Sequence, residues 1–317
     1  MKKEEFFYDS MDGLTKIHGI RWIPDVEIRA VLQISHGMAE FLDRYDGFAE
    51  YMAEKGILAV GNDHLGHGGS IRTMDDLGFF ADRRGNDFVI GDMHTLMKMT
   101  KKQYPSVPYF LIGHSMGSFL TRIFITKYGG EINGAILSGT ADQPDFMLWF
   151  GIIITRMIET AKGPRYRSPF INKLAFDSNN SRFMPSRTRA DWLTTDESIV
   201  EWYLANEKCG FIFTLSAYRD MFRQMLYIKK KKNLEQMPKS LPVIFLSGKD
   251  DPVGEFGKGV ERAYRRFAGT GMKDISIRLY EGARHEILNE TNKEIVYNGI
   301  YEWLEGHITR AQEDAGK

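Results

Sequence analysis

The chain has 317 residues, of which 43% are hydrophobic and 26% are charged, so we expect a substantial core in one large domain or in a domain with an insertion. Its formal net charge of +0 argues against a nucleic-acid partner, because binding a phosphate backbone usually requires a basic surface. The single cysteine, Cys209, excludes an internal disulfide, and neither a secretory signal nor a membrane-spanning run is visible, so we expect a cytoplasmic protein.

Strands and helices alternate along the first part of the chain. The predicted strands lie at 14–22, 26–34, 57–61, 107–112 and 134–137, the first two on either side of a turn at Pro24-Asp25. The predicted helices lie at 45–55, 86–104 and 119–128. A glycine-rich loop occupies 62–70. This alternation predicts an α/β fold with a mostly parallel sheet and helices on both faces.

From about Ala141 to Pro238 the alternation stops, and the sequence is mainly helical or irregular, with many aromatic residues and methionines. The alternation then returns, with strands predicted at 241–247 and 275–280 and helices at 255–267 and 292–308. We therefore expect a core formed by residues 1–140 and 239–317. Residues 141–238 are predicted to form a helical lid over the carboxyl edge of the sheet, where such folds place their sites.

The stretch Gly113-His114-Ser115-Met116-Gly117 follows an apolar strand and precedes a helix. This is the context of the Gly-x-Ser-x-Gly motif, in which a tight turn exposes a nucleophilic serine. Glycines at the flanking positions let the chain turn back closely on the strand and the helix. Ser115 is therefore the predicted nucleophile.

A serine hydroxyl needs a base, which is usually a histidine oriented by a carboxylate. His285 follows the strand at 275–280 and is the predicted base. Asp250 and Asp251 both follow the strand at 241–247, and their spacing from Gly248 and the next proline favours Asp251. The main-chain amides of Met38 and Met116 are predicted to hold the oxyanion, one after an early strand and one after the nucleophile.

Five motifs in the chain resemble, in the same order, those of monoacylglycerol lipases and bacterial lysophospholipase-like proteins of the α/β-hydrolase superfamily. They are His36-Gly37-Met38-Ala39-Glu40, Asp63-His64-Leu65-Gly66-His67-Gly68-Gly69-Ser70, Gly113-His114-Ser115-Met116-Gly117, Gly248-Lys249-Asp250-Asp251-Pro252-Val253-Gly254 and Gly282-Ala283-Arg284-His285-Glu286. The resemblance spans about residues 14–308 and implies the α/β-hydrolase fold, a serine hydrolase mechanism and no cofactor or metal. Ser118 departs from the pattern, because many relatives carry a second glycine there.

The pair His64 and His67 is a poor metal site, because it has no nearby cysteine and is surrounded by flexible glycines. The resemblance implies instead that this loop braces the oxyanion strand. The run 229–232 of four lysines indicates a solvated helix face, with attraction to anionic lipid as the alternative.

The run 146–154 is apolar on every side of a helix, so it must be buried or meet an apolar partner. It is predicted to be lid core or the wall of an acyl-chain pocket that touches a membrane surface transiently. The predicted substrate-binding residues are Phe146, Trp149, Phe150, Phe211 and Phe213, with Met157 and Trp202 as further possibilities.

These features predict hydrolysis of carboxylic esters with an apolar acyl chain, the substrate being a lipid or another small ester. An aminopeptidase or amidase with the same triad is the alternative, and Asp142, Asp145 and Glu207 are the acids that would hold a substrate amino group. A non-catalytic binding protein is disfavoured because all three triad residues are present. Dehalogenase chemistry is excluded because it requires an aspartate in place of Ser115.

Overall fold

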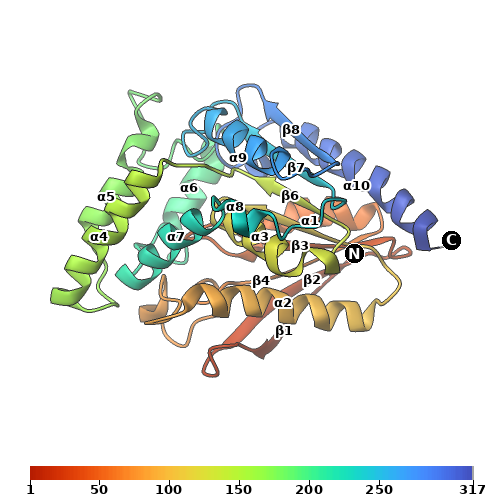
Figure 1. Ribbon diagram of the computed structural model, residues 1–317, viewed down its shortest axis with the longest axis horizontal. Helices are drawn as coiled ribbons and strands as arrows, with labels where there is room; N and C mark the ends of the chain where they lie inside the picture. Colours follow the sequence, from red (N-terminus) through yellow and green to blue (C-terminus); the bar gives the residue numbers. More distant parts are fainter. Residues whose placement is uncertain (316–317) are drawn as a thin grey trace.

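The computed structural model describes residues 1–315 and is built around a central sheet (Figure 1). Its strands are β1 (Lys2–Asp9), β2 (Lys16–Ile23), β3 (Ala30–Ser35), β4 (Ile57–Asn62), β5 (Tyr109–His114), β6 (Gly134–Ser138), β7 (Val243–Gly248) and β8 (Ile275–Tyr280). Within the described residues they lie in the order β1-β2-β4-β3-β5-β6-β7-β8. The pairs β1–β2 and β2–β4 are antiparallel, and the remaining pairs are parallel. The mostly parallel sheet predicted from the sequence is confirmed.

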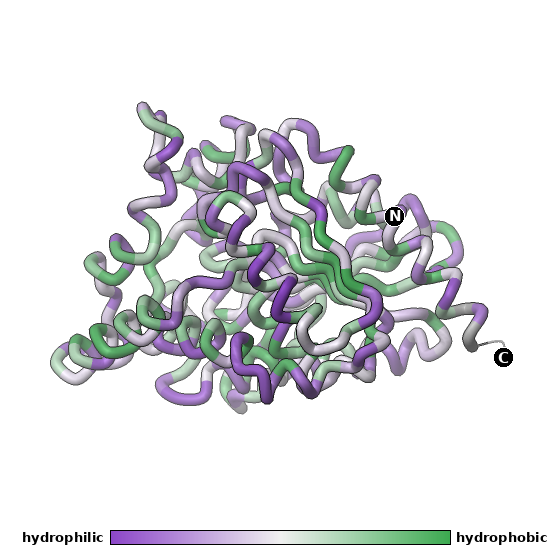
Figure 2. The backbone as a smooth tube through the Cα atoms, turned by 45° about the horizontal axis from the view of Figure 1, so that its top comes forward, coloured by the Kyte–Doolittle hydropathy of each residue, from purple (hydrophilic) through white to green (hydrophobic). Residues whose placement is uncertain are grey.

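Helices cover both faces of the sheet. One face packs against α1 (Asp46–Glu54) and α10 (Lys293–Ala315), and the other against α2 (Gly85–Gln103), α3 (Met116–Tyr128) and α9 (Lys258–Ala268). Strands β3 to β7 are buried along their whole length, because parallel strands covered on both faces meet no water. Figure 2 shows these central strands as the hydrophobic middle of the molecule.

The amino-terminal strands differ from the prediction. Strand β1 was not predicted, because it opens with four charged residues, followed by three aromatic ones, and lies at the edge of the sheet, where much of the strand stays exposed. The two strands flanking Pro24-Asp25 exist, but they are not neighbours, because β4 lies between β2 and β3. The helix predicted from residue 255 begins at Lys258 instead, since residues 255–257 have positive φ angles and form a turn.

Between β6 and β7 the chain forms α4 (Asp145–Lys162), α5 (Pro169–Phe176), α6 (Glu197–Ala205), α7 (Leu215–Tyr227) and α8 (Lys231–Leu234), and Figure 1 shows α4 and α5 at one end of the molecule. Helix α4 is not uniformly buried. Leu148, Gly151, Ile152 and Thr155 form its buried face, which packs against α7. Phe146, Trp149, Ile153 and Met157 recur at helical spacing on its exposed face.

The start of this helical segment and the residues just before α8 meet at an ion pair. The Lys229 ammonium lies 3.3 Å from the buried carboxylate of Asp142, which also accepts a hydrogen bond from Arg266 at 2.6 Å. The side chain of Lys229 is only 8% exposed and is paired, which corrects the solvated interpretation for this residue, whereas Lys230, Lys231 and Lys232 are exposed as predicted. No helix within residues 1–315 is long and apolar enough to cross a membrane.

Candidate active site

Ser115 lies in the turn between β5 and α3 and has a φ of +52° and a ψ of −119°. Non-glycine residues rarely adopt a positive φ, so the surrounding structure must hold the turn in place. The Ser115 amide donates to the carbonyl of Ser138 on β6 at 2.9 Å. The hydroxyl of Ser118 donates to the Ser115 carbonyl at 2.6 Å. The residue that departs from the family pattern thus stabilises this turn.

Two glycines allow this turn to pack against the sheet. A Cβ on Gly117 would lie 1.9 Å from the carbonyl oxygen of Ser35, and a Cβ on Gly113 would lie 2.3 Å from the carbonyl oxygen of Gly117. Both distances are far below van der Waals contact with main-chain atoms, which cannot move aside cheaply. Glycine is therefore required at both positions for α3 to start directly above β3 and β5.

Two other predicted residues meet at the carboxyl ends of β7 and β8. Nδ1 of His285 lies 3.0 Å from Oδ1 of Asp251. Asp251 also accepts hydrogen bonds from the Val253 amide at 2.9 Å and from the Ser247 hydroxyl at 3.2 Å. His285 and Asp251 are buried, whereas Asp250 is exposed. Of the two aspartates left open by the sequence, the structure brings Asp251 to the histidine.

The contact favours the charged form of each group. Burial raises the pKa of Asp251, but the charge of His285 and several hydrogen bonds outweigh it and hold that pKa below its usual range. Burial lowers the pKa of His285, but the charge of Asp251 and the hydrogen bond to it raise the net pKa above its usual value. The ring of His114 lies 4.8 Å from that of His285, and burial, reinforced by the charge of His285, lowers the pKa of His114 to about 4. At neutral pH His114 is therefore uncharged.

The loop after β3 lies beside Ser115, because a Cβ on Gly37 would come within 3.3 Å of the Ser115 Cβ. In this loop the Gly37 amide donates to Oε1 of Glu40 at 2.5 Å, and the Ala39 amide to Nε2 of His67 at 3.2 Å. Within residues 1–315 neither the Met38 amide nor the Met116 amide donates to another protein group. The two amides predicted to hold an oxyanion thus remain available.

A buried arginine that the sequence analysis did not single out connects this loop to the histidine. The Arg44 guanidinium donates to Glu40 at 2.7 Å and to both carboxylate oxygens of Glu286, the neighbour of His285. Burial raises the pKa of Glu286, but the positive charge of Arg44 lowers it to about 2. The spacing of four residues between Glu40 and Arg44 is typical of an ion pair and could have indicated the Arg44–Glu40 contact from the sequence. The contact between Arg44 and Glu286 spans 242 residues and has no comparable signal in the sequence.

A cavity of about 890 Å³ joins these groups, and Ser115, His285, Met38 and Met116 all line it. Of the predicted substrate-binding residues, Phe146, Phe150 and Phe211 line the same cavity. Two others lie elsewhere. Trp149 is exposed on α4 and does not line the cavity, and Phe213 is buried, with its ring 5.3 Å from that of His67. Met157 and Trp202 also lie outside the described cavity lining, whereas Trp192, which the sequence did not indicate, belongs to it.

The loop at 62–70 holds a cluster of buried histidines. His36 accepts a hydrogen bond from the His64 amide at 2.9 Å, and His67 accepts that of Ala39. Burial lowers the pKa of each of these histidines, that of His67 to about 3, so all three are neutral braces of the loop. Within the described residues no group of three or more His, Cys, Asp or Glu side chains is arranged to hold a metal ion.

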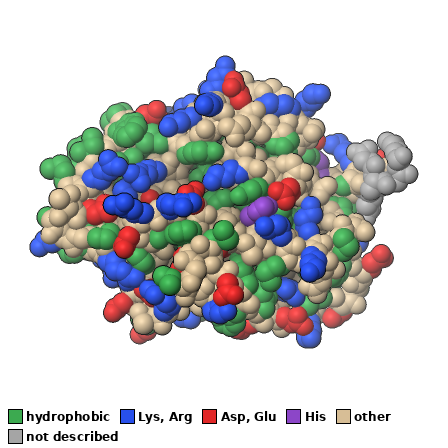
Figure 3. Space-filling model, turned by 60° about the horizontal axis from the view of Figure 1, so that its bottom comes forward, with side chains coloured by type: hydrophobic (Ala, Val, Ile, Leu, Met, Phe, Trp, Pro, Cys, Tyr) green, Lys and Arg blue, Asp and Glu red, His purple; other side chains and the backbone are tan. Residues whose placement is uncertain are grey.

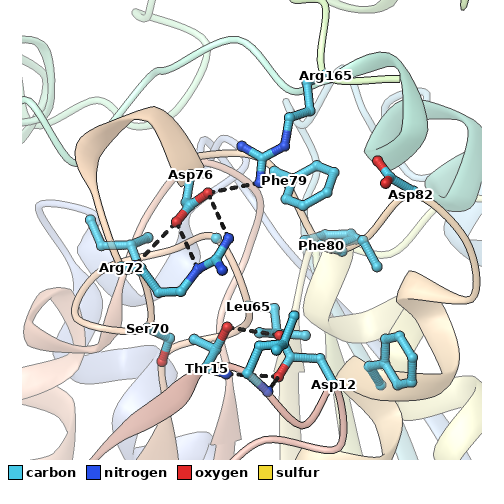
Figure 4. Close-up of a pocket in the computed structure, with 15 residues that line it drawn as sticks. Asp12, Thr15, Leu65, Ser70, Arg72, Asp76, Phe79, Phe80, Asp82 and Arg165 are labelled. Carbon is cyan, nitrogen blue, oxygen red and sulfur yellow. Dashed lines mark hydrogen bonds and ion pairs between the residues drawn. The ribbon is translucent and has the colours of Figure 1, made fainter. Parts of the chain in front are cut away.

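A second, smaller cavity of about 250 Å³ lies beyond this loop, between the β1–β2 turn and the start of α2 (Figure 4). Asp76 lies between two arginines there, 3.3 Å from Arg72 and 2.9 Å from Arg165. The Arg165 guanidinium also stacks on the ring of Phe79. The charge of Asp76 is thus balanced by these two arginines.

The chain matches the family described as "Serine aminopeptidase, S33" over residues 26–292. It is 23% identical over 312 residues to a monoacylglycerol lipase of Mycolicibacterium smegmatis, covering 96% of this chain and 98% of that protein. It is 25% identical over 296 residues to the monoglyceride lipase of Rattus norvegicus, covering 92% and 87% of the two chains.

Two solved structures show the same fold. A thermostable carboxyl esterase from Bacillus coagulans, in complex with glycerol, superposes with a TM-score of 0.90 at 26% identity over 97% of this chain and 99% of its own. A soluble variant of the monoglyceride lipase from Saccharomyces cerevisiae superposes with a TM-score of 0.76 at 21% identity, covering 96% and 94% of the two chains. With its sheet, its serine turn and its family match, the chain belongs to the serine aminopeptidase S33 family of α/β-hydrolases.

Proposed function

We propose that the protein hydrolyses carboxylic esters with an apolar acyl chain through an acyl-enzyme intermediate. Ser115 attacks the ester carbonyl, His285 takes its proton and passes it to the leaving alcohol, and Asp251 orients His285. The Met38 and Met116 amides stabilise the oxyanion, each by about 3 kcal/mol in the transition state. The observation that carries this proposal is the buried His285–Asp251 pair at the cavity that Ser115 also lines.

The cavity and the relatives support a monoacylglycerol as the substrate. The cavity volume of about 890 Å³ lies within the range of small-molecule sites. Apolar residues from α4 and from the segment before α7 form much of the cavity wall. The curated relatives that match nearly the whole chain are named for monoacylglycerol hydrolysis. A long acyl chain fits between the apolar side chains, and the glycerol moiety leaves as the alcohol.

An aminopeptidase is not favoured, although the family description names one. Such an enzyme needs a free carboxylate for the amino group of its substrate. Asp142, Asp145 and Glu207 do not line the described cavity. The carboxylates that do line it are ion-paired: Glu40 and Glu286 bind Arg44, Glu255 binds Arg262, and Asp177 lies 3.5 Å from Lys173.

We also propose that residues 141–238 form a lid whose outer face touches lipid surfaces transiently. The exposed stripe on α4 continues into α5, where Phe170 and Leu174 are about half exposed. Figure 3 shows apolar side chains among lysines and arginines at the end of the molecule where Figure 1 places these helices. Apolar side chains with a basic rim are typical of surfaces that bind the headgroup region of a membrane.

The test is hydrolysis by Ser115→Ala of a medium-chain p-nitrophenyl ester, a monoacylglycerol and a lysophospholipid, with an aminoacyl amide as the peptidase substrate. We expect the wild-type protein to cleave the esters and the variant to lose this activity and its labelling by a fluorophosphonate. Ser240→Ala, at an exposed serine, is the matched control and should behave as wild type. Near-normal ester turnover by Ser115→Ala would refute the assignment.

A further inference from the structure

A short segment of the helical insertion, residues 191–195, lies directly against the loop that carries His285. The Glu286 amide donates to the Leu193 carbonyl at 2.7 Å, and the His285 amide to the Trp192 carbonyl at 3.5 Å. The ring centroids of Trp192 and His285 are 5.1 Å apart, with the planes inclined by 39°. Both side chains line the large cavity. The insertion therefore contacts the histidine itself.

Two side chains of the histidine loop fasten this segment. The Arg284 guanidinium donates to the carbonyl oxygens of Asp191 and Thr194. The buried carboxylate of Glu290 accepts a hydrogen bond from the Arg284 amide at 2.6 Å through one oxygen, and bonds from the amide and hydroxyl of Thr195 through the other. A single carboxylate thus bridges the two chain segments, away from the cavity.

The segment is also anchored within the insertion. The Trp192 amide donates to the side-chain oxygen of Asn180 at 2.9 Å. Leu193 packs with Ala190 and Val200 in a small buried cluster. Trp192 is therefore held through its amide, its carbonyl and its ring.

The contacts of the His285 imidazole show how Trp192 affects the orientation of this ring. Asp251 fixes the Nδ1 side of the His285 ring, but one hydrogen bond leaves the ring free to tilt about that contact. Neighbouring rings limit such a tilt by packing, and His285 has two, His114 at 4.8 Å and Trp192 at 5.1 Å. His114 comes from the core, whereas Trp192 comes from the insertion.

We propose that Trp192, held by Arg284 and Glu290, is a positioning residue that fixes the tilt of the His285 imidazole toward Ser115. The insertion then completes the catalytic centre in addition to covering it. This inference rests on the proposed role of His285 as the base.

The test compares Trp192→Leu and Trp192→Phe on p-nitrophenyl acetate, whose short acyl group does not need the apolar part of the cavity. We expect Trp192→Leu to lower kcat about tenfold with KM within about twofold of wild type, in line with the cost of misplacing a catalytic group. Trp192→Phe should keep most of the wild-type kcat, because it leaves an aromatic ring in the same place. Glu290→Gln, outside the described cavity lining, is expected to lower kcat in the same way. Trp202→Leu, at an exposed tryptophan of the insertion, is the control and should leave kcat unchanged.

A raised KM with unchanged kcat in Trp192→Leu would make Trp192 a wall of the substrate site and overturn the proposal. An equal loss in the Leu and Phe variants, together with a lower midpoint of thermal unfolding in both, would show a purely structural role and also overturn it. The proposed function fails separately, if His285→Ala and Ser115→Ala keep their ester turnover. If those two variants are inactive and Trp192→Leu has a wild-type kcat, only the positioning role is refuted.

Discussion

The guanidinium of Arg44 binds the carboxylate of Glu286 through two hydrogen bonds, of 2.6 and 2.5 Å, and both side chains are at most 5% exposed. The same guanidinium binds Glu40, which holds the Gly37 amide. The loop beside Ser115 and the loop carrying His285 are therefore joined by one buried cation between two carboxylates.

Replacing Arg44 tests this junction. Arg44→Met leaves two buried carboxylates without the cation that pairs with them, and we expect the free energy of unfolding to fall by about 3–5 kcal/mol. Urea denaturation measures the change. Arg29→Met is the matched control, because Arg29 pairs with Glu305 at the surface and such pairs contribute about 1 kcal/mol or less. Equal stabilities of the two variants would contradict the buried network.

The two neighbouring aspartates give opposite predictions for the pH dependence of ester hydrolysis. Asp251 raises the pKa of His285. Asp251→Asn removes the negative charge that counteracts the effect of burial on His285. The pKa of His285 therefore falls, and the acid limb of the kcat/KM profile moves to lower pH. The variant should also lose about 10⁴-fold in kcat, because the orienting carboxylate is gone. Asp250→Asn should keep the wild-type profile, and a shifted limb in this variant would reverse the assignment of the two residues.

Gly117 tests the packing of the serine turn. Because a Cβ there would lie 1.9 Å from a main-chain oxygen of β3, Gly117→Ala should lower the free energy of unfolding by about 3 kcal/mol or more. Gly130→Ala, where a Cβ would meet nothing within 4 Å, is the control and should change stability little. Thermal unfolding of both variants checks the expectation, which is wrong if Gly117→Ala melts as wild type does.

The buried neutral histidines predict a loss of stability in mild acid. The pKa of His67 falls from about 6.5 in the unfolded chain to about 3 in the folded protein, so between these values the unfolded chain binds more protons. This group therefore makes the free energy of unfolding rise with pH across that window, by about 1.4 kcal/mol per pH unit. Urea denaturation measured from pH 4 to 7 should show that the free energy of unfolding of His67→Gln rises less steeply with pH than that of the wild type. An unchanged slope would show that His67 does not contribute.

The proposed lipid contact of α4 is tested by changing its outer face. The triple variant Trp149→Ser, Ile153→Ser, Met157→Ser removes exposed apolar side chains that do not line the described cavity. We expect it to lose cosedimentation with vesicles of phosphatidylcholine and phosphatidylserine, while hydrolysing p-nitrophenyl acetate as before. The control replaces the exposed Val26, Met74 and Ile295 by serine and should sediment as wild type. Undiminished binding by the α4 variant would refute this contact.

Local patterns in the sequence were sufficient for most of the fold. The buried strands β3 to β7 are mainly apolar, and each is followed by the glycine or polar residues of a loop. Strand β1 escaped prediction because an edge strand needs no continuous apolar run. The separation of β2 from β3 was also hidden, because the order of strands in a sheet is set by tertiary packing that neighbouring residues do not encode.

The candidate site shows the same limit. Ser115, Asp251 and His285 follow strands with recognisable motifs, so their place at the carboxyl edge of the sheet could be expected from the order of the strands. Arg44 and Trp192 carry no comparable signal. Each contacts the His285 loop only after the chain has folded, across 242 residues for Arg44 and Glu286. Likewise, sequence alone could not tell which residues of α4 face inward, because its apolar run covers the whole helix circumference.

The ion pair between Asp142 and Lys229 has an evolutionary consequence. Asp142 lies just after β6 and Lys229 just before α8, and their 3.3 Å contact holds these two parts of the chain together, so much of the segment between them can lengthen or shorten without displacing a strand. Natural variation can therefore reshape the substrates accepted, provided that residues 191–195 keep their contacts with the His285 loop. Grafting the corresponding segment of a relative onto these two anchors would transfer its chain-length preference as a unit.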